Sequence, residues 1–160
     1  MAIVRKAAHG DLADLRTLAI SVFTITFESA NNPKDFKTYM DEAFTTEKIE
    51  SEFLEEGSQF FVADEAGTLV GYARVRRSSE ANHLLGENNM ELQRLYVDIP
   101  WQGKGIANQL LIACEEFVAA NSYSDHEGWI WLGVWEHNHK AQHQKDSEHI
   151  QHVYVLFCLI

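Results

Sequence analysis

The chain has 160 residues, 46% of them hydrophobic, and a formal net charge of −11. This length and apolar content suit one globular domain with its own core, so we expect a single domain over residues 1–160. The scarcity of Lys and Arg argues against a nucleic-acid partner, because neutralising phosphates requires clustered basic side chains. The acidic balance favours a cationic partner, but it also suits a protein that is only kept soluble by its charge, and both interpretations stay open.

Neither a signal peptide nor a membrane span is expected. The first ten residues contain no long apolar run, and no later segment could cross a bilayer, so we expect a cytoplasmic protein with no membrane partner. The two cysteines, Cys114 and Cys158, both fall in apolar surroundings and have no zinc spacing. We interpret them as core residues and expect no disulfide.

The first predicted elements are a strand over residues 3–7 and a helix that Asp11 can cap. The apolar positions of this helix form one face: Leu12, Leu15, Leu18, Ala19, Val22 and Phe23. A turn-rich break over residues 27–33 follows.

A second, interrupted helical stretch is predicted over residues 39–44 and 47–56, with Thr45 or Thr46 as its cap. Ile49 and Phe53 are expected to face inward. The outer face is expected to be acidic and to consist of Glu47, Glu50, Glu52, Glu55 and Glu56.

The middle of the chain predicts antiparallel strands. Residues 59–63 and 68–76 form a hairpin around a turn at 64–67, and residues 78–89 are predicted to be a polar loop. Further on, residues 129–135 are predicted to be a buried strand and residues 136–141 to open a last helix.

The stretch from Glu91 to Leu111 organises the rest of the chain. Residues 91–99 alternate as a strand does, and the residues after them recur at helical spacing: Ile106, Leu110, Ala113, Cys114, Phe117 and Val118. Between strand and helix lie residues small or flexible enough for close approach of a ligand: Gln102, Gly103, Lys104, Gly105 and Ala107. Because the first amides of a helix lack partners, this junction predicts a site for a phosphate or pyrophosphate.

Two well-known phosphate loops do not fit this stretch. Asn108 stands where the dinucleotide fingerprint requires its third glycine. The Walker loop requires Ser or Thr after Gly-Lys, and here Gly103 and Lys104 are followed by Gly105. A glycine-rich turn with no ligand stays open as an alternative.

Gln102, Gly105 and Ala107 match the pattern Gln/Arg-x-x-Gly-x-Gly/Ala after a strand that ends at residues 95–98. In this form the stretch resembles the acetyl-CoA pyrophosphate loop of the GNAT acetyltransferase superfamily. The order of elements over about residues 3–141 is similar to the GNAT acyl-CoA N-acyltransferase fold. That fold is α+β, with a three-layer α/β/α arrangement around a central mixed sheet, and the carboxyl-terminal end of this chain is atypical of it.

The resemblance is closest to bacterial spermidine/spermine N-acetyltransferases. The segments that carry this closer resemblance are Thr26-Phe27 and residues 39–44, 58–61 and 131–136. They are less specific than the loop, so the polyamine hypothesis is weaker than the acetyltransferase hypothesis.

The resemblance implies acetyl-CoA as cosubstrate and assigns residues to it. The residues implied for its pyrophosphate are Gln102, Gly103, Lys104, Gly105, Ile106 and Ala107, those for its pantetheine are Leu95, Tyr96 and Val97, and Asn138 is implied to contact the cofactor arm. It also implies a bulge in the central strand, which frees backbone N–H groups, and a separation of this strand from residues 131–135.

Glu91 is the candidate general base. It lies eleven residues before Gln102, the spacing at which some superfamily members carry a strand glutamate for this role. The alternative is a solvated carboxylate at a strand end, since many relatives use water instead.

The resemblance breaks after Asn138 and Ala141. Gln144 and Lys145 stand where the family has Phe-Tyr, whose tyrosine is the usual acid, and only residues 153–160 remain to form a strand. A frameshifted end and a divergent member both stay open. Because the last segment is apolar and would form a sheet edge, we expect a homodimer.

Five histidines lie in the same region and raise the question of a metal site. They fall between residues 137 and 152, and His139 and His143 are four residues apart. No carboxylate or cysteine completes a ligand set, so we predict no metal.

The sequence therefore predicts an acetyl-CoA-dependent N-acetyltransferase that acts on a primary amine of a small molecule, with a polyamine as first candidate. The alternative is a catalytically impaired protein that binds acyl-CoA or polyamines.

Overall fold

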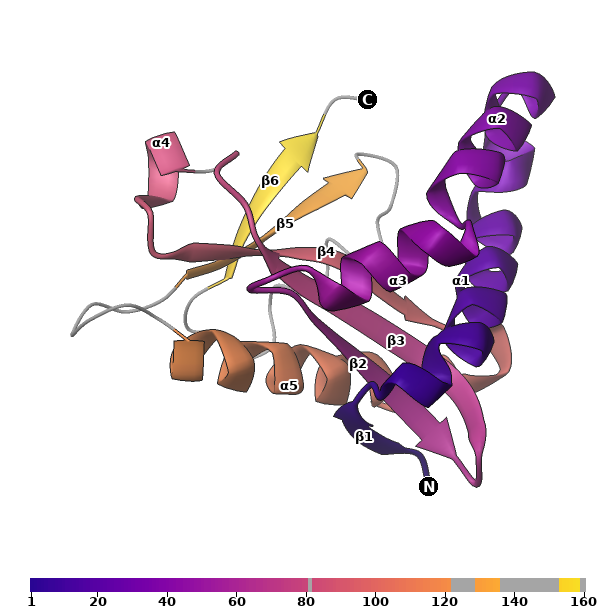
Figure 1. The fold of residues 1–160 in the computed structure, drawn as a ribbon, viewed down its shortest axis with the longest axis horizontal. Helices are drawn as coiled ribbons and strands as arrows, with labels where there is room; N and C mark the ends of the chain where they lie inside the picture. The colour runs from indigo at the N-terminus through magenta and orange to yellow at the C-terminus, as the bar shows by residue number, and fades with distance from the viewer. Residues whose placement is uncertain (81, 122–128, 136–152, 159–160) are drawn as a thin grey trace.

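The computed structural model describes residues 1–80, 82–121, 129–135 and 153–158. Its six strands form one sheet in which spatial order equals chain order. They are β1 (Ile3–Lys6), β2 (Gln59–Glu65), β3 (Thr68–Arg77), β4 (Asn89–Val97), β5 (Trp129–Trp135) and β6 (Val153–Cys158). Strands β1 to β4 pair antiparallel, and β4–β5 and β5–β6 pair parallel, so the predicted mixed sheet is confirmed (Figure 1).

Helices cover both faces of the sheet, as predicted (Figure 1). The longer ones are α1 (Leu12–Phe27), α2 (Pro33–Ala43), α3 (Thr46–Leu54) and α5 (Ile106–Asn121), and the short ones are η1 (His9–Asp11), η2 (Glu28–Ala30), α4 (Asn82–Leu85) and η3 (Ile99–Trp101). Helix α5 packs on one face through Leu110, Cys114 and Val118. Helices α1 and α3 pack on the opposite face, where Leu15 and Ile49 are fully buried.

The hairpin of β2 and β3 follows from its turn residues. Glu65 pairs with Thr68, and the two residues between them, Ala66 and Gly67, have φ values of +50° and +86°. Two successive left-handed residues form the tight turn whose twist suits a hairpin, and Asp64 stabilises it by accepting a hydrogen bond from the Gly67 amide at 2.8 Å. The predicted hairpin is therefore confirmed, and Thr45 is confirmed as the cap of α3, where its hydroxyl accepts from the Lys48 amide at 3.0 Å.

Several predicted boundaries are wrong for local reasons. Helix α2 begins at Pro33 instead of residue 39, because Asn32 caps it and proline suits the first helical position. The predicted loop over residues 78–89 contains the one-turn helix α4 and the first residue of β4.

Asp11 does precede α1, but its carboxylate makes no capping bond to that helix. It accepts hydrogen bonds from Arg5 Nη1 and from the Ala8 amide, both at 2.7 Å.

Across the part of the chain that the structure describes, no helix is long and apolar enough to span a bilayer. The predicted helix at residues 136–141 and its Asn138 lie outside the described residues.

Candidate active site

Strand β4 carries a bulge at its centre. Arg74 of β3 pairs with Arg94, but the next residue, Val75, pairs with Leu92, so Gln93 is an extra residue in β4. Leu92 and Leu95 pack in the core under α5. Gln93 and Arg94 both contact groups on the opposite face, where α3 lies. The bulge thus places two consecutive side chains on one face, as an inserted residue does.

Just before this bulge, β4 and β5 separate. Their last registered pair joins Glu91 to Trp131. Beyond it, β5 continues along β6 as far as Trp135, while the described residues pair no part of β5 with residues 92–97. The two parallel strands thus diverge beyond this pair, and one backbone edge of β4 has no strand partner among the described residues (Figure 1). We call this divergence the opening between β4 and β5. The separation predicted for residues 95–97 and 131–135 is confirmed.

The chain leaves β4 through a tightly bonded turn. Asp98 accepts from the Ile99 amide at 2.9 Å, and the Gln102 amide donates to the Ile99 carbonyl at 3.1 Å. The Gln102 side chain donates to the carbonyl of Val97 at 3.0 Å. Gln102 thus fastens the loop to the end of β4.

Two glycines then shape the loop before α5. Gly103 and Gly105 have φ values of +75° and +79°, which favour glycine strongly. A Cβ built at either position meets no heavy atom within 4 Å, so the backbone there faces open space. Ile106 is only 4% exposed and anchors the first turn of α5 in the core. The first amides of α5 have no intrahelical acceptor, and the helix dipole adds positive potential, so the loop fits an anionic diphosphate.

Lys104 is the basic side chain of this loop. Its Nζ lies 4.2 Å from the ring centroid of Trp101, a cation–π contact that holds the side chain beside the helix start.

Glu91 lies at the last paired position before the opening. Its Oε2 lies 2.7 Å from Arg76 Nε, and its side chain is 13% exposed. The Arg76 guanidinium is also 4.0 Å from Glu80. The alternative of a solvated strand-end carboxylate is therefore wrong: Glu91 is largely buried and oriented by an arginine. Whether it acts as a base stays a prediction.

The profile of the Acetyltransferase (GNAT) domain matches residues 24–127, more than half of the chain. The chain belongs to the GNAT acetyltransferase family. An uncharacterised N-acetyltransferase from the pepI 3′ region of Lactobacillus delbrueckii subsp. lactis is 27% identical over 155 residues, 94% of this chain and 87% of that protein.

Solved structures share the GNAT fold. PaiA N-acetyltransferase from Thermoplasma acidophilum, crystallised with coenzyme A, superposes with a TM-score of 0.61 at 22% identity, over 74% of this chain and 72% of that one. An aminoglycoside acetyltransferase from an uncultured soil metagenomic sample, in complex with sisomicin, has a TM-score of 0.66 at 18% identity, over 98% of this chain and 97% of that one.

The residues predicted to line the pantetheine in this GNAT protein are split between the two faces of β4. Leu95 and Val97 pack toward α5, whereas Tyr96 packs toward α1 and stacks on Tyr72 with ring centroids 5.7 Å apart. Burial raises the pKa of Tyr96 to about 12, so its hydroxyl is protonated at neutral pH. Leu95 and Val97 have no polar side-chain atoms, so any hydrogen bonds from these two residues to a ligand must come from their backbone.

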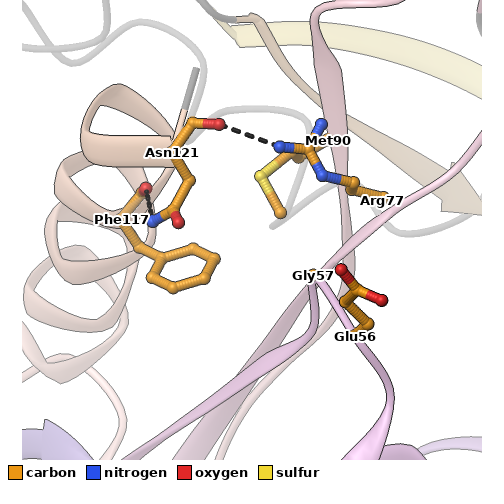
Figure 2. Close-up of a pocket in the computed structure, with 6 residues that line it drawn as sticks. All are labelled: Glu56, Gly57, Arg77, Met90, Phe117 and Asn121. Carbon is orange, nitrogen blue, oxygen red and sulfur yellow. Dashed lines mark hydrogen bonds between the residues drawn. The ribbon is translucent and has the colours of Figure 1, made fainter. Parts of the chain in front are cut away.

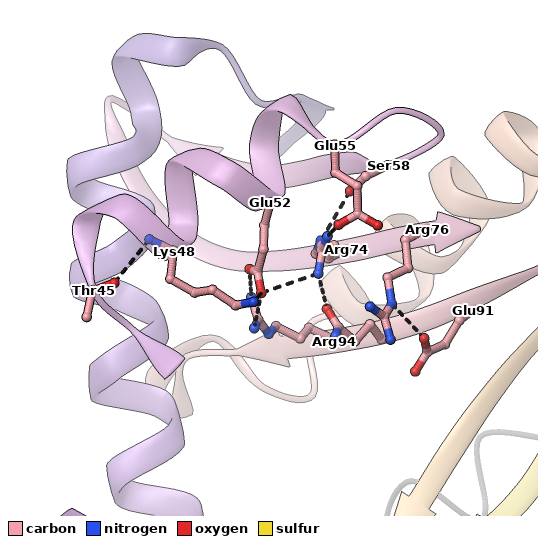
Figure 3. Close-up of polar contacts among 10 residues, drawn as sticks. Thr45, Lys48, Glu52, Glu55, Ser58, Arg74, Arg76, Glu91 and Arg94 are labelled. Atoms are coloured by element: carbon pink, nitrogen blue, oxygen red, sulfur yellow. Dashed lines mark hydrogen bonds and ion pairs between the residues drawn. The ribbon is translucent and has the colours of Figure 1, made fainter. Parts of the chain in front are cut away.

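A buried ion cluster lies on the α3 side of the GNAT sheet, and sequence reasoning missed it (Figure 3). Glu52, predicted to be on the outer face of α3, is only 4% exposed. Its carboxylate binds Arg94 of β4 and lies 3.4 Å from Arg74 of β3. The prediction for Glu52 is wrong because α3 packs over Arg74 and Arg94, whose buried charges pair with this carboxylate. The spacing of three residues between Ile49 and Glu52 also puts both on the inner face of the helix.

A pocket of about 420 Å³ lies away from the loop (Figure 2). It is lined by Glu56, Gly57, Arg77, Met90, Phe117 and Asn121. Asn121 is the last residue of α5, and the glycine loop precedes its first, so about 22 Å of helix separates the two. This pocket is therefore separate from the glycine loop.

Among the described residues, no group of three metal-ligating side chains gathers, and His137 to His152 lie outside the described ranges.

Proposed function

We propose that this acetyltransferase transfers the acetyl group of acetyl-CoA to a primary amine of a small polycationic molecule, with a polyamine as first candidate. The observation that carries the proposal is the position of the opening between β4 and β5. It begins at Glu91, and the edge of β4 that no described strand pairs leads from there to the glycine loop at the start of α5. A long cosubstrate with a diphosphate at one end and a thioester at the other suits such a path.

Residues 102–107 would hold the diphosphate, chiefly through backbone amides at the start of α5. Gly103 and Gly105 leave the space that its oxygens require, and Lys104 adds positive charge nearby. The free edge of residues 95–97 would bond to the pantetheine. When bound, acetyl-CoA supplies the activated acetyl group. Asn138, which the family resemblance implies for the cofactor arm, lies outside the described residues.

Glu91 would help to remove a proton from the amine. A primary amine with a pKa near 10.4 is deprotonated at pH 7 at a cost of roughly 4–5 kcal/mol, so a positioned base contributes substantially. Arg76 supports this role by fixing the direction of the carboxylate, whose Oε2 lies 2.7 Å from Arg76 Nε. The amides of the β4 bulge would stabilise negative charge that develops on the carbonyl oxygen.

The charge of the chain supports a polycationic substrate. A net charge of −11 attracts cations, and the exposed glutamates Glu47, Glu50 and Glu56, in α3 and just after it, add local negative potential. One solved relative is an aminoglycoside acetyltransferase in complex with sisomicin. A panel of substrates should therefore include aminoglycosides beside polyamines.

The test measures acetyl-CoA affinity by calorimetry and CoA release with spermidine, spermine, sisomicin and a monoamine of similar size. The expected result is saturable release, with a higher kcat/KM for the polycations than for the monoamine. Release with the monoamine alone would contradict the substrate class. Tight binding of acetyl-CoA with no release from any amine would favour the alternative, a protein that binds acyl-CoA without turnover.

A further inference from the structure

The ion cluster of Figure 3 joins α3 to the bulge of β4. Glu52 receives two hydrogen bonds from Arg94, one from Nη1 to Oε2 at 2.6 Å and one from Nη2 to Oε1 at 3.0 Å. This two-point geometry fixes both the distance and the direction of the arginine. The Arg94 guanidinium also lies 5.7 Å from the ring centroid of Phe44.

The second side chain of the bulge is held by a parallel set of contacts. Arg74, which is 1% exposed, donates to the Gln93 carboxamide and to Glu55. Its Nε donates to the Ser58 hydroxyl at 3.1 Å. Both bulge residues are therefore connected to α3 or to the residues just after it, Arg94 directly through Glu52 and Gln93 through Arg74 and Glu55.

A bulge needs such contacts to keep its register. Side chains alternate between the two faces along a strand. If the bulge shifted by one position, the residue between its old and its new position would turn its side chain to the opposite face. If the bulge moved past Arg94, that charged residue would point into the apolar core under α5, where Leu92 and Leu95 now pack. The charge pairs with Glu52 and Glu55 oppose this move, and burial limits screening by solvent and salt.

We propose that Glu52 and Arg94 are positioning residues, which fix the bulge so that the free edge of β4 meets the thioester in the geometry that transfer requires. The proposal rests on the proposed function, because the opening is taken to hold acetyl-CoA. A purely structural role is the competing explanation: the cluster would then only attach α3 to the sheet. The two explanations differ in what happens to kcat when the cluster is removed from a folded protein.

The test variant is Glu52→Leu/Arg94→Met. Removing one partner alone would leave a buried charge unpaired and could unfold the protein, whereas replacing both by apolar residues of similar volume is often tolerated. Arg74 loses its 3.4 Å contact with Glu52 but keeps Glu55, Gln93 and Ser58 as partners. We expect a cooperatively folded protein whose kcat falls at least tenfold, while its affinity for CoA changes less than threefold because the glycine loop is untouched. Arg94→Lys, which keeps the charge but loses the two-point geometry, should have an intermediate kcat.

The matched control is Arg5→Met/Asp11→Asn. This pair has the same two-point geometry, with distances of 2.7 and 2.9 Å, but joins β1 to η1, at the far side of β2 and β3 from the bulge. Arg5 also donates to Asp64 of β2 at 2.9 Å, and the control removes this contact as well. It should lower the melting temperature without lowering kcat. An unchanged kcat in the Glu52→Leu/Arg94→Met variant would overturn the proposal, as would an equal loss of kcat in the control.

Amide hydrogen exchange gives a second readout that does not depend on turnover. In the test variant, exchange should rise in residues 92–97 and stay unchanged in β2. A uniform rise across the sheet would indicate a structural role only and would also overturn the proposal. If the wild-type protein does not release CoA with any of the amines, the proposed function fails, but the exchange pattern still decides whether the cluster fixes the bulge.

Discussion

Gly105 and Gly86 allow a direct test of the cofactor loop at the level of single residues. Both have a positive φ, +79° and +74°, and a Cβ at either position meets nothing within 4 Å. Gly105→Glu and Gly86→Glu should therefore carry similar backbone strain. Only Gly105→Glu places a carboxylate at the start of α5, so it should abolish acetyl-CoA binding by calorimetry while Gly86→Glu binds normally. Equal affinity in the two variants would remove the loop from the cofactor site.

Glu91 and Glu80 form a second matched pair, because both carboxylates lie within 4.0 Å of Arg76. Glu91 is largely buried at the strand opening, whereas the Glu80 side chain is 69% exposed. We expect Glu91→Gln to lower kcat on a primary amine about 10²-fold and Glu80→Gln to leave it within twofold. Steady-state kinetics at saturating acetyl-CoA measures both. Equal kcat values for Glu91→Gln and the wild type would show that Glu91 is not the base and that water removes the proton.

The residues of the loop could be predicted from sequence because their constraint is local. Glycines at 103 and 105 followed by a helical period specify a strand-to-helix junction without knowledge of the rest of the fold. The partners of Glu91 and Glu52 could not be predicted in this way. Arg76 and Arg94 are far from them along the chain, and only the pairing of β3 with β4 and the packing of α3 bring these charges together.

In α3 and β4, the sequence predicts which positions face the core but not the partner of a buried charge or the position of the bulge. The helical period placed Ile49 and Phe53 inward correctly, and Ile49 is 1% exposed. The same period puts Glu52 on that face, but the local sequence predicts an exposed glutamate because it supplies no partner for a buried carboxylate. The bulge at Gln93 was implied by the family resemblance. No pattern within β4 indicated its position.

The junction of β1 and η1 gives a pH-dependent prediction at the scale of elements. The hydrogen bond from Arg5, together with that from the Ala8 amide, lowers the pKa of Asp11 to about 2. Because this folded value lies below the unfolded value near 3.9, the contact stabilises the fold above about pH 4, and the stabilisation is lost as the pH falls toward 2. Asp11→Asn should lower the free energy of unfolding at pH 7 by on the order of 1 kcal/mol, since Arg5 is partly exposed and solvent screens the pair.

Urea unfolding at pH 7 and pH 3 measures this effect. The gap between wild type and Asp11→Asn should be smaller at pH 3. A gap independent of pH would mean that the carboxylate charge contributes nothing and that only its hydrogen-bonding shape matters.

For the whole molecule, the net charge of −11 predicts a dependence of activity on salt. Attraction between an acidic protein and a polycation weakens as the Debye length shortens, from about 10 Å at 0.1 M to about 3 Å at 1 M ionic strength. The kcat/KM for spermidine should therefore fall more steeply with NaCl than that for a monoamine. If kcat/KM falls equally with NaCl for the two amines, the net charge does not attract the substrate and contributes only to solubility.

Among the described strands, β6 lies at the end of the sheet and pairs with β5 alone. A strand with one unpaired edge can pair with a second copy of itself, so we predict a homodimer through this edge. Sedimentation velocity should detect it, and Val155→Lys should shift the protein toward monomer by placing a charge in the strand. A wild-type protein that sediments as a monomer at all concentrations would contradict the prediction.

The strand order of the sheet also bears on how the chain folds during synthesis. Each of the six strands pairs only with its neighbours in the sequence, so no described strand must insert between two that formed earlier. A chain that leaves the ribosome amino terminus first can add its strands in the order in which they emerge. The bulge, the glycine loop and α5 are all synthesised by Asn121. Of the surface proposed to hold acetyl-CoA, the edge of β4 and the glycine loop are thus synthesised before either parallel partner strand, β5 or β6.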